Sequence, residues 1–116
     1  MAVEQCKYRS FEEGAEHTIG IFIATLLDLV KTRGLKAFIH PVVPVLDQTR
    51  DSVKKFNAIF RKMVEETEGL TWLNFFDDLL TAEGDDLKEE FKLDGTHMHP
   101  AYLSLVAREL TAAFSK

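Results

Sequence analysis

Three stretches of the chain place apolar residues three and four positions apart, the spacing of an amphipathic helix with one buried face. The first covers residues 11–34 and ends at Gly34, a natural C-terminal stop. The second covers residues 49–69, and the third covers residues 101–114 after Pro100, which suits the first turn of a helix. The pattern therefore predicts three helices.

Two shorter stretches between the helices are rich in β-branched and aromatic residues, which is typical of buried strands. One is "LKAFIHPVV", residues 35–43, which Pro41 and Pro44 bring to an end. The other is "LTWLNFF", residues 70–76. The segment that follows, residues 77–93, is acidic and is expected to be irregular. The predicted order is α-β-α-β-loop-α.

Alternating helices and strands predict an α/β fold with parallel strands, in which the second helix is a right-handed crossover. Two strands form a small sheet, however, because a doubly wound domain has about five or six. The edges of such a sheet leave backbone groups unpaired unless another element covers them. We therefore expect residues 1–116 to form a single, partial domain, and we expect a protein partner or a second chain to cover the open sheet edge.

Composition and charge exclude several classes of function. The chain has 116 residues and a formal net charge of −5, without the clustered Lys and Arg that a nucleic-acid surface needs. No apolar run is long enough to cross a membrane and no glycine-rich phosphate loop occurs, so neither a membrane span nor a cofactor is expected. Cys6 is the only cysteine and no secretory leader opens the sequence, which favours an intracellular, cytoplasmic protein and leaves an organelle open.

One stretch near the C-terminus, "KLDGTHMHPAYLSLV", holds the candidate chemistry. Asp94 and His97 lie three positions apart around Gly95, which permits a tight bend. In a serine hydrolase the histidine is the general base and the acid fixes its tautomer, and this spacing is compatible with both roles. Two alternatives stay open. Asp94 begins an Asx-type turn and His97 or His99 is a polar residue before a helix, or Asp94, His97 and His99 bind a metal ion.

The segment "LDGTHMHPAYLSLVAREL" resembles the last conserved block of the SGNH (GDSL-type) hydrolases, in which D-G-x-H precedes a short spacer, an aromatic residue and the final helix. Upstream, "GLKAFIHPVVPVLDQTRDSVKKFNAIFRKM" is similar to the penultimate strand of that family, its proline-containing loop and a helix with an R-x-x-V-x-x-(F/Y)-N pattern. The residues in this pattern are Arg50, Val53, Phe56 and Asn57. "LTWLNFFDDLL" resembles the last strand and the acidic turn after it, and "AVEQCKYRSFEEGAEHTI" resembles the segment after the third block.

This resemblance covers nearly the whole chain and implies a three-layer α/β/α, flavodoxin-like fold that hydrolyses esters or other acyl groups. It implies that Asp94 and His97 are the acid and the base of the triad. The chain lacks the G-D-S-like block with the nucleophilic serine, and it lacks the two blocks that carry the oxyanion-hole glycine and the asparagine. None of the serines that it contains follows a predicted strand at a sharp turn: Ser10, Ser52, Ser104 and Ser115.

The resemblance thus implies the C-terminal portion of an ester hydrolase, which supplies the Asp-His part of a Ser-His-Asp triad. Such a portion is expected to be inactive alone, because triad members act as a unit. The serine, glycine and asparagine then come from an upstream segment or a companion chain. The alternative is a non-catalytic structural or interaction subunit, derived from such a hydrolase, that completes its sheet with a partner.

Overall fold

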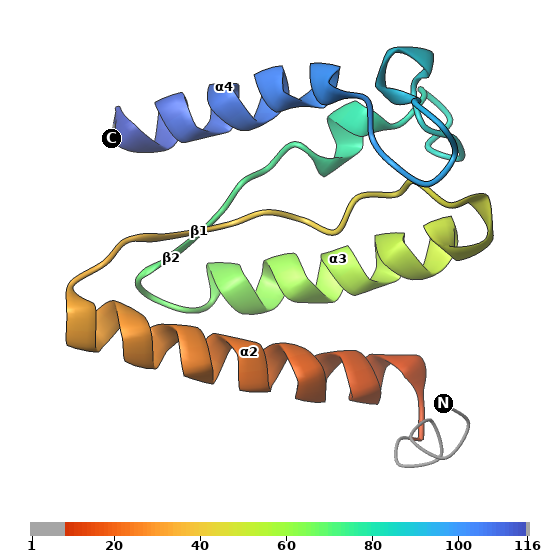
Figure 1. Cartoon of the computed structure of the whole chain (residues 1–116). Coiled ribbons are helices and arrows are strands. Elements are labelled where there is room, and N and C mark those ends of the chain that lie inside the picture. Colours follow the sequence, from red (N-terminus) through yellow and green to blue (C-terminus); the bar gives the residue numbers. More distant parts are fainter. Residues whose placement is uncertain (1–8, 116) are drawn as a thin grey trace.

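The structure, a computed structural model, describes residues 9–115, so that Cys6 and the first part of the family resemblance lie outside the described residues. Figure 1 shows the course of the chain from the N-terminal to the C-terminal helix. The predicted α-β-α-β-loop-α order is confirmed, and the two strands pair in parallel. The helices and strands are α2 (Phe11–Arg33), β1 (Ala37–Ile39), α3 (Arg50–Glu65), β2 (Leu70–Trp72) and α4 (Leu103–Phe114).

α2 begins and ends where its sequence provides caps. The hydroxyl of Ser10 accepts the backbone N–H of Glu13 at 3.1 Å, which satisfies one of the donors that a helix start leaves unpaired. Gly34 ends the helix with φ at +63°, in the left-handed region that favours glycine. Within residues 9–115, none of the helices combines the length and the apolar character that a bilayer span requires.

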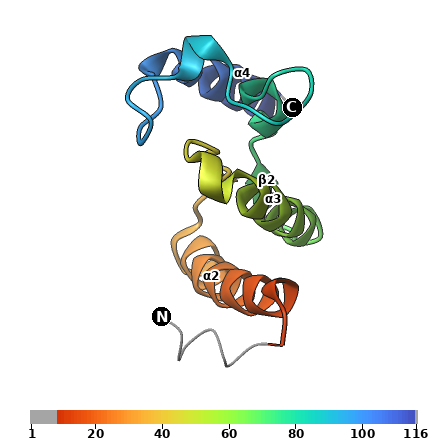
Figure 2. The same cartoon turned by 90° about the vertical axis from the view of Figure 1, so that its right-hand side faces the viewer.

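The helices cover the strand pair on both of its faces, as Figures 1 and 2 show. α2 and α3 pack against each other and against one face, in a core that includes Ile19 of α2, Val64 of α3 and Trp72 of β2. α4 covers the opposite face, where Leu105 of α4 and Phe38 of β1 pack against a buried cluster that includes Phe75. Successive side chains of a strand point to opposite faces, so a three-residue strand serves both cores.

Both strands are shorter than the sequence predicts. β1 was expected within residues 35–43 and β2 within residues 70–76, but each pairs over only three residues. Two causes act together. Pro41 and Pro44 have no N–H group that could donate to a neighbouring strand. In addition, each strand has only one neighbour in the two-stranded sheet, so few backbone hydrogen bonds extend the pairing beyond the three paired residues.

The acidic segment 77–93 lacks α-helix and regular strand, as predicted, but it is tightly anchored. It contains or adjoins two short 3-10 helices, Phe76–Leu79 and Glu89–Phe91, and an antiparallel bridge joins Leu80 to Leu87. Leu87 is 2% exposed and belongs to the core beneath α4. The apolar residues in this segment therefore fix the path that leads to the candidate site.

Two polar side chains on the buried face of α3 hold the proline-containing loop that follows β1. Asn57 is buried, and its amide accepts the N–H of Val42 at 3.0 Å and donates to the carbonyl of Val42 at 2.8 Å. Arg50 is also buried and donates to the carbonyls of Pro44 at 3.1 Å and Val45 at 3.2 Å. The loop thus satisfies its backbone groups through α3 instead of through a ladder.

Candidate functional site

Asp94 and His97 lie on a loop that an antiparallel bridge between Lys92 and Met98 closes at its base. Gly95 stands within the loop with φ at +87°, where a residue with a side chain would be strained. The bend that the glycine predicts is therefore present. The loop leads directly into the short 3-10 helix that precedes α4.

The structure brings the two sequence-predicted site residues into contact. Nδ1 of His97 lies 3.0 Å from Oδ2 and 3.2 Å from Oδ1 of Asp94. Oδ1 also accepts the backbone N–H groups of Thr96 at 3.0 Å and His97 at 2.9 Å. Asp94 is therefore both the first residue of an Asx-type turn and the partner of the imidazole, so the structural and the functional interpretation are compatible.

The partners of the imidazole assign its tautomer. A carboxylate only accepts hydrogen bonds, so the ring nitrogen that faces Asp94, Nδ1, carries the proton. The other nitrogen, Nε2, then carries the lone pair that a general base needs. The side chains of His97 and Asp94 are 72% and 51% exposed. The pair is thus formed in the orientation that a triad uses, but it lies on the surface of the described chain.

Hydrogen bonds hold the pKa of the Asp94 carboxyl well below its usual range. The largest cause is the backbone N–H of Thr96, followed by the ring of His97, and the hydroxyl of Thr96 and the N–H of His97 act in the same direction. These donors stabilise the charged form. The carboxylate therefore stays ionised throughout the range in which a histidine base works.

The depressed pKa has a consequence for the pH dependence of the loop. A carboxyl with a folded-state pKa below the unfolded value stabilises the fold fully above the unfolded pKa, and this contribution is lost progressively as the pH falls from the unfolded pKa through the folded pKa. We expect the carboxyl carbon signal of Asp94 to titrate at a lower pH in the folded chain than in an unfolded peptide. In an unfolded peptide with the sequence KLDGTHMH the same carboxyl should titrate near pH ~3.9. Equal NMR midpoints in chain and peptide would contradict the turn geometry.

A nucleophile for this base is missing from the described residues. Among residues 9–115, the side chains that the His97 ring contacts by hydrogen bonds are Asp94 and Thr96. The serines are engaged locally or lie on helices: Ser10 caps α2, Ser52 lies in the first turn of α3, Ser104 donates to Ala101, and Ser115 donates to Thr111. As the sequence predicts, none of them follows a strand.

The metal-binding alternative finds no support in the geometry. His99 caps the 3-10 helix Pro100–Tyr102, and its Nδ1 accepts the N–H of Ala101 at 3.0 Å. In the part of the chain that the structure describes, no group of three His, Cys, Asp or Glu side chains could hold a metal ion. The structure therefore brings Asp94 to His97 and does not bring His99 to them as a third ligand.

A hollow of about 530 Å³ lies beside the ring of His97. Leu46 and Leu93 line it, and these side chains are 42% and 57% exposed although they are large and apolar. Arg50 and Lys92 belong to the lining as well, but carboxylates neutralise both cations. The hollow thus combines apolar side chains with a polar wall next to the imidazole, and it does not offer an uncompensated charge.

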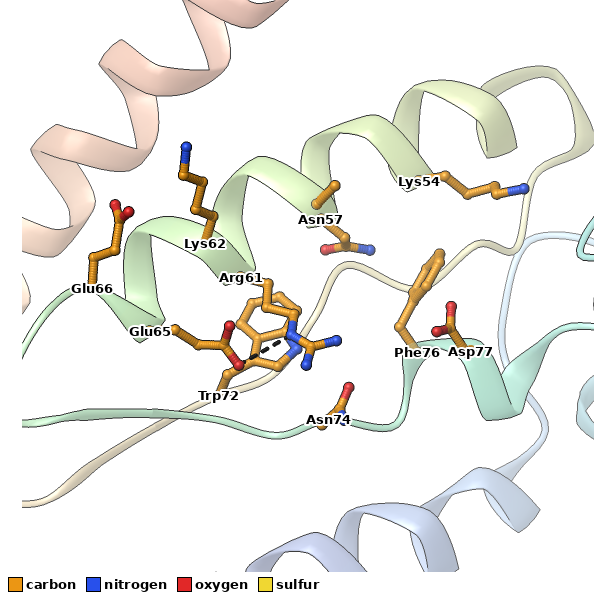
Figure 3. A pocket seen from close by; sticks show the side chains of 11 residues that line it. Lys54, Asn57, Arg61, Lys62, Glu65, Glu66, Trp72, Asn74, Phe76 and Asp77 are labelled. Carbon is orange, nitrogen blue, oxygen red and sulfur yellow. Dashed lines mark hydrogen bonds and ion pairs between the residues drawn. The ribbon is translucent and has the colours of Figure 1, made fainter.

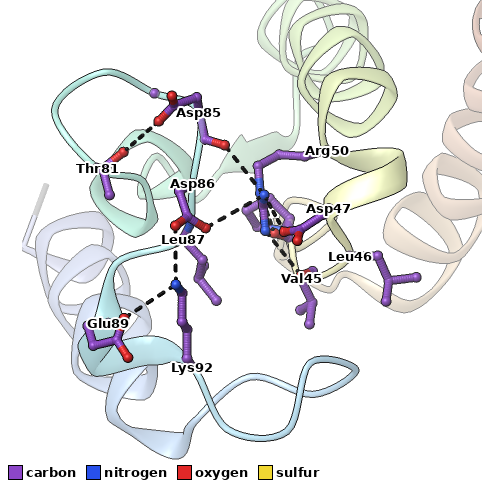
Figure 4. A network of polar contacts seen from close by, with 12 residues as sticks. Val45, Leu46, Asp47, Arg50, Thr81, Asp85, Asp86, Leu87, Glu89 and Lys92 are labelled. Carbon is purple, nitrogen blue, oxygen red and sulfur yellow. Dashed lines mark hydrogen bonds and ion pairs between the residues drawn. The ribbon is translucent and has the colours of Figure 1, made fainter.

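Figure 4 shows the polar network that forms the wall of this hollow. Arg50 bonds to Asp47 at 2.7 Å and lies 3.7 Å from Asp86, and Lys92 bonds to Asp86 at 3.1 Å and to Glu89 at 3.3 Å. The hydrogen bond between Asp86 and Lys92 is the largest cause that lowers the pKa of the acid and raises the pKa of the base. The network ties the start of α3 to the segment that leads into the Asp94 loop.

In the sequence, Arg50 and Asn57 belong to the pattern that resembles the SGNH family, and that pattern predicts no role for either residue. A signal was present, however. Both residues share a helical face with Val53, Phe60 and Val64, at steps of three and four. A polar residue within an apolar stripe is buried, and a buried polar group needs partners. That spacing alone could have identified both as anchors of the neighbouring loops.

Two further hollows lie beside the two strands and differ in chemistry. Figure 3 shows the first, between α3 and the segment around β2, and most of the residues that line it are charged or polar, although apolar atoms make up more of its surface: Lys54, Asn57, Ala58, Arg61, Lys62, Glu65, Glu66, Trp72, Asn74, Phe76 and Asp77. The second, of about 410 Å³, lies beside β1, and apolar residues dominate its lining: Thr18, Ile19, Phe22, Phe38, Ile39, His40, Phe56 and Phe60.

Comparisons with known proteins do not place the chain in a family: no family model, no curated protein and no solved structure matches it. What the site does is therefore inferred from its own geometry together with the sequence.

Proposed function

We propose that this chain supplies the acid and the base of a serine hydrolase of the SGNH (GDSL-type) class, which acts on esters or related acyl compounds. The observation that carries the proposal is the contact between Asp94 and Nδ1 of His97 on a tight loop before the last helix. In this proposal a segment outside residues 1–116 supplies the serine and the oxyanion donors. That segment lies upstream in the same polypeptide or on a second chain, and it completes a flavodoxin-like sheet.

The geometry of the pair suits the steps of acyl transfer. Nε2 of His97 takes the proton from the serine hydroxyl while the serine oxygen attacks the acyl carbon, and the carbonyl oxygen becomes an oxyanion. When the carbon–oxygen bond to the alcohol breaks, the imidazolium returns its proton to the leaving oxygen. Water then repeats the sequence and releases the acid. Asp94 stays ionised throughout, because its donors depress its pKa, and it stabilises the imidazolium.

The chemistry of the two sheet edges supports a docking position for the missing segment. Charged side chains beside a strand discourage the addition of another strand, and the hollow on the β2 side has that character. The hollow on the β1 side is apolar, and Phe22 at its rim is 46% exposed. We therefore assign the open edge of β1 to the segment that completes the sheet, since a strand there would pair its backbone and bury this surface.

A second candidate function is favoured by a specific observation. His97 is 72% exposed, and the described residues place no nucleophile beside it. A subunit that has lost catalysis and kept the apolar edge beside β1 would have the same structure. In that case the chain binds a partner through its sheet, and the Asp94–His97 pair only shapes the turn before α4.

The activity of the isolated chain tests whether the catalytic residues are divided between residues 1–116 and another segment. We expect the purified 116-residue chain to show no hydrolysis of p-nitrophenyl acetate beyond its His97→Ala variant, because each missing oxyanion donor alone costs about 10²- to 10³-fold in rate. The same assay on the native assembly, meaning the polypeptide or complex that contains this chain in its source cells, should show turnover. Turnover by the isolated chain that disappears in His97→Ala would contradict the proposed division. An inactive native assembly would favour the interaction subunit.

A further inference from the structure

Thr96 stands between the two members of the pair. Its hydroxyl oxygen lies 3.0 Å from Oδ1 of Asp94 and 2.9 Å from Nδ1 of His97. Three donors meet at Oδ1, namely the hydroxyl of Thr96 and the backbone N–H groups of Thr96 and His97. Oδ2 is left to the imidazole, at 3.0 Å. The carboxylate is thus oriented before the imidazole makes its contact.

The positions of the protons follow from this arrangement. The hydroxyl of Thr96 has one hydrogen, and the carboxylate of Asp94 has none to give. If the hydroxyl donates to Oδ1, the only group left to donate to Oδ2 is the Nδ1–H of His97, and the lone pairs of the hydroxyl oxygen also face that N–H. An unprotonated Nδ1 would instead face both carboxylate oxygens of Asp94 and the hydroxyl oxygen of Thr96, and only the hydroxyl has a hydrogen to donate. The carboxylate therefore favours the Nδ1–H tautomer, and the hydroxyl supports this preference by its bond to Oδ1, which holds Oδ2 toward Nδ1.

Solvent exposure makes this support necessary. An ion pair or hydrogen bond between exposed side chains is weak in water, because each partner keeps its rotamer freedom and its hydration. Asp94 and His97 are both exposed. Threonine is β-branched, so its χ1 angle is restricted and its hydroxyl can be held in place without burial.

We propose that Thr96 is a positioning residue for this pair: its hydroxyl turns Oδ2 of Asp94 toward the ring of His97 and keeps the ring proton on Nδ1. The catalytic meaning of this role rests on the proposed hydrolase function. The role itself belongs to the geometry of the loop, and it can be measured in the 116-residue chain without a nucleophile or a substrate.

The test compares three variants at position 96 by the nitrogen chemical shifts of the His97 ring, recorded at a pH at which the imidazole is neutral. Thr96→Ser keeps the hydroxyl, Thr96→Val replaces it with a methyl group, and Thr96→Ala removes it without adding bulk. We expect Thr96→Ser to retain most of the Nδ1–H form of the parent chain, because serine keeps the hydroxyl but not the β-branch that restricts χ1. In Thr96→Val and Thr96→Ala the ratio of the Nδ1–H to the Nε2–H form should fall by about tenfold, the effect of one charge-assisted hydrogen bond.

The Thr96→Ala variant separates the loss of the hydroxyl from a steric displacement of the His97 ring. The added methyl of the valine would lie where the hydroxyl oxygen is 2.9 Å from Nδ1, so it displaces the ring for steric reasons as well. The proposal is overturned if Thr96→Ala keeps the tautomer ratio of the parent chain, or if Thr96→Ser loses it. Neither result would change whether a serine reacts in the native assembly, so the failure of this inference and the failure of the proposed hydrolase function are distinguishable.

Discussion

Replacing His97 with alanine in the native assembly should slow its reaction with a fluorophosphonate by about 10²- to 10⁴-fold, the usual contribution of a general base. The reagent phosphonylates an activated serine and releases fluoride, and the serine proton must leave as the new bond forms. In the proposed site Nε2 of His97 accepts that proton. The variant is best introduced into the tagged gene product in its source cells, and the labelling rate is followed by intact mass.

His99→Asn is the matched control for this experiment. It removes an imidazole two positions from His97, and asparagine is a good N-cap that can still accept the N–H of Ala101. We expect the control to label at the parental rate. Equal loss of labelling in both variants would point to a damaged loop, and parental labelling in His97→Ala would exclude His97 as the base.

Replacing Arg50 with methionine should lower the free energy of unfolding by about 2–4 kcal/mol, because it leaves the buried carbonyl of Pro44 and two partly buried carbonyls without this donor. Arg50 is 6% exposed, and its guanidinium donates to the carbonyls of Pro44, Val45 and Asp85 from within the fold. Its contact with Asp47 adds less, because that carboxylate is 82% exposed. Urea unfolding of the purified chain, followed by tryptophan fluorescence, measures the change.

Arg61→Met provides the comparison on the same helix. Arg61 pairs with Glu65 at 3.1 Å, and both side chains are about half exposed. A surface pair of this kind contributes little, so the change should stay within about 0.5 kcal/mol. Similar losses in the two variants would contradict the role of Arg50 as an anchor of the loops at both ends of the network in Figure 4.

The helices could be predicted from the sequence because each carries its own signals. α2 has a serine cap and a glycine stop, and the third helix has a proline in the short 3-10 turn that leads into it. These signals act locally, within one or two turns of the backbone. The lengths of the strands were harder to predict, because a strand extends only as far as it pairs with a neighbouring strand, and its own sequence does not specify that pairing. Their order and direction follow from the alternation with helices, but their length of three residues does not.

In the candidate site, contacts between residues that are close in the sequence could be predicted, and contacts between residues that are far apart in the sequence could not. The contact of Asp94 with His97 follows from a spacing of three around Gly95, so the sequence alone suggests it. The contact of Arg50 with Asp86 joins positions 36 residues apart, and it depends on how the acidic segment folds back over α3. The position of Thr96 between the pair lies within the loop, but only the side-chain rotamers reveal which atoms its hydroxyl reaches.

Fluorophosphonate labelling of the native assembly, with the adduct mapped by peptide mass, tests the central proposal most directly. The proposal predicts one modified serine outside residues 1–116, on a segment that is continuous with this chain or that co-purifies with it, and it predicts loss of the adduct in His97→Ala. The contradicting result is an intact, folded assembly that stays unmodified while a control serine hydrolase in the same extract is labelled. In that case the pair of Asp94 and His97 would serve the turn, and the apolar edge beside β1 would be the functional surface of the molecule.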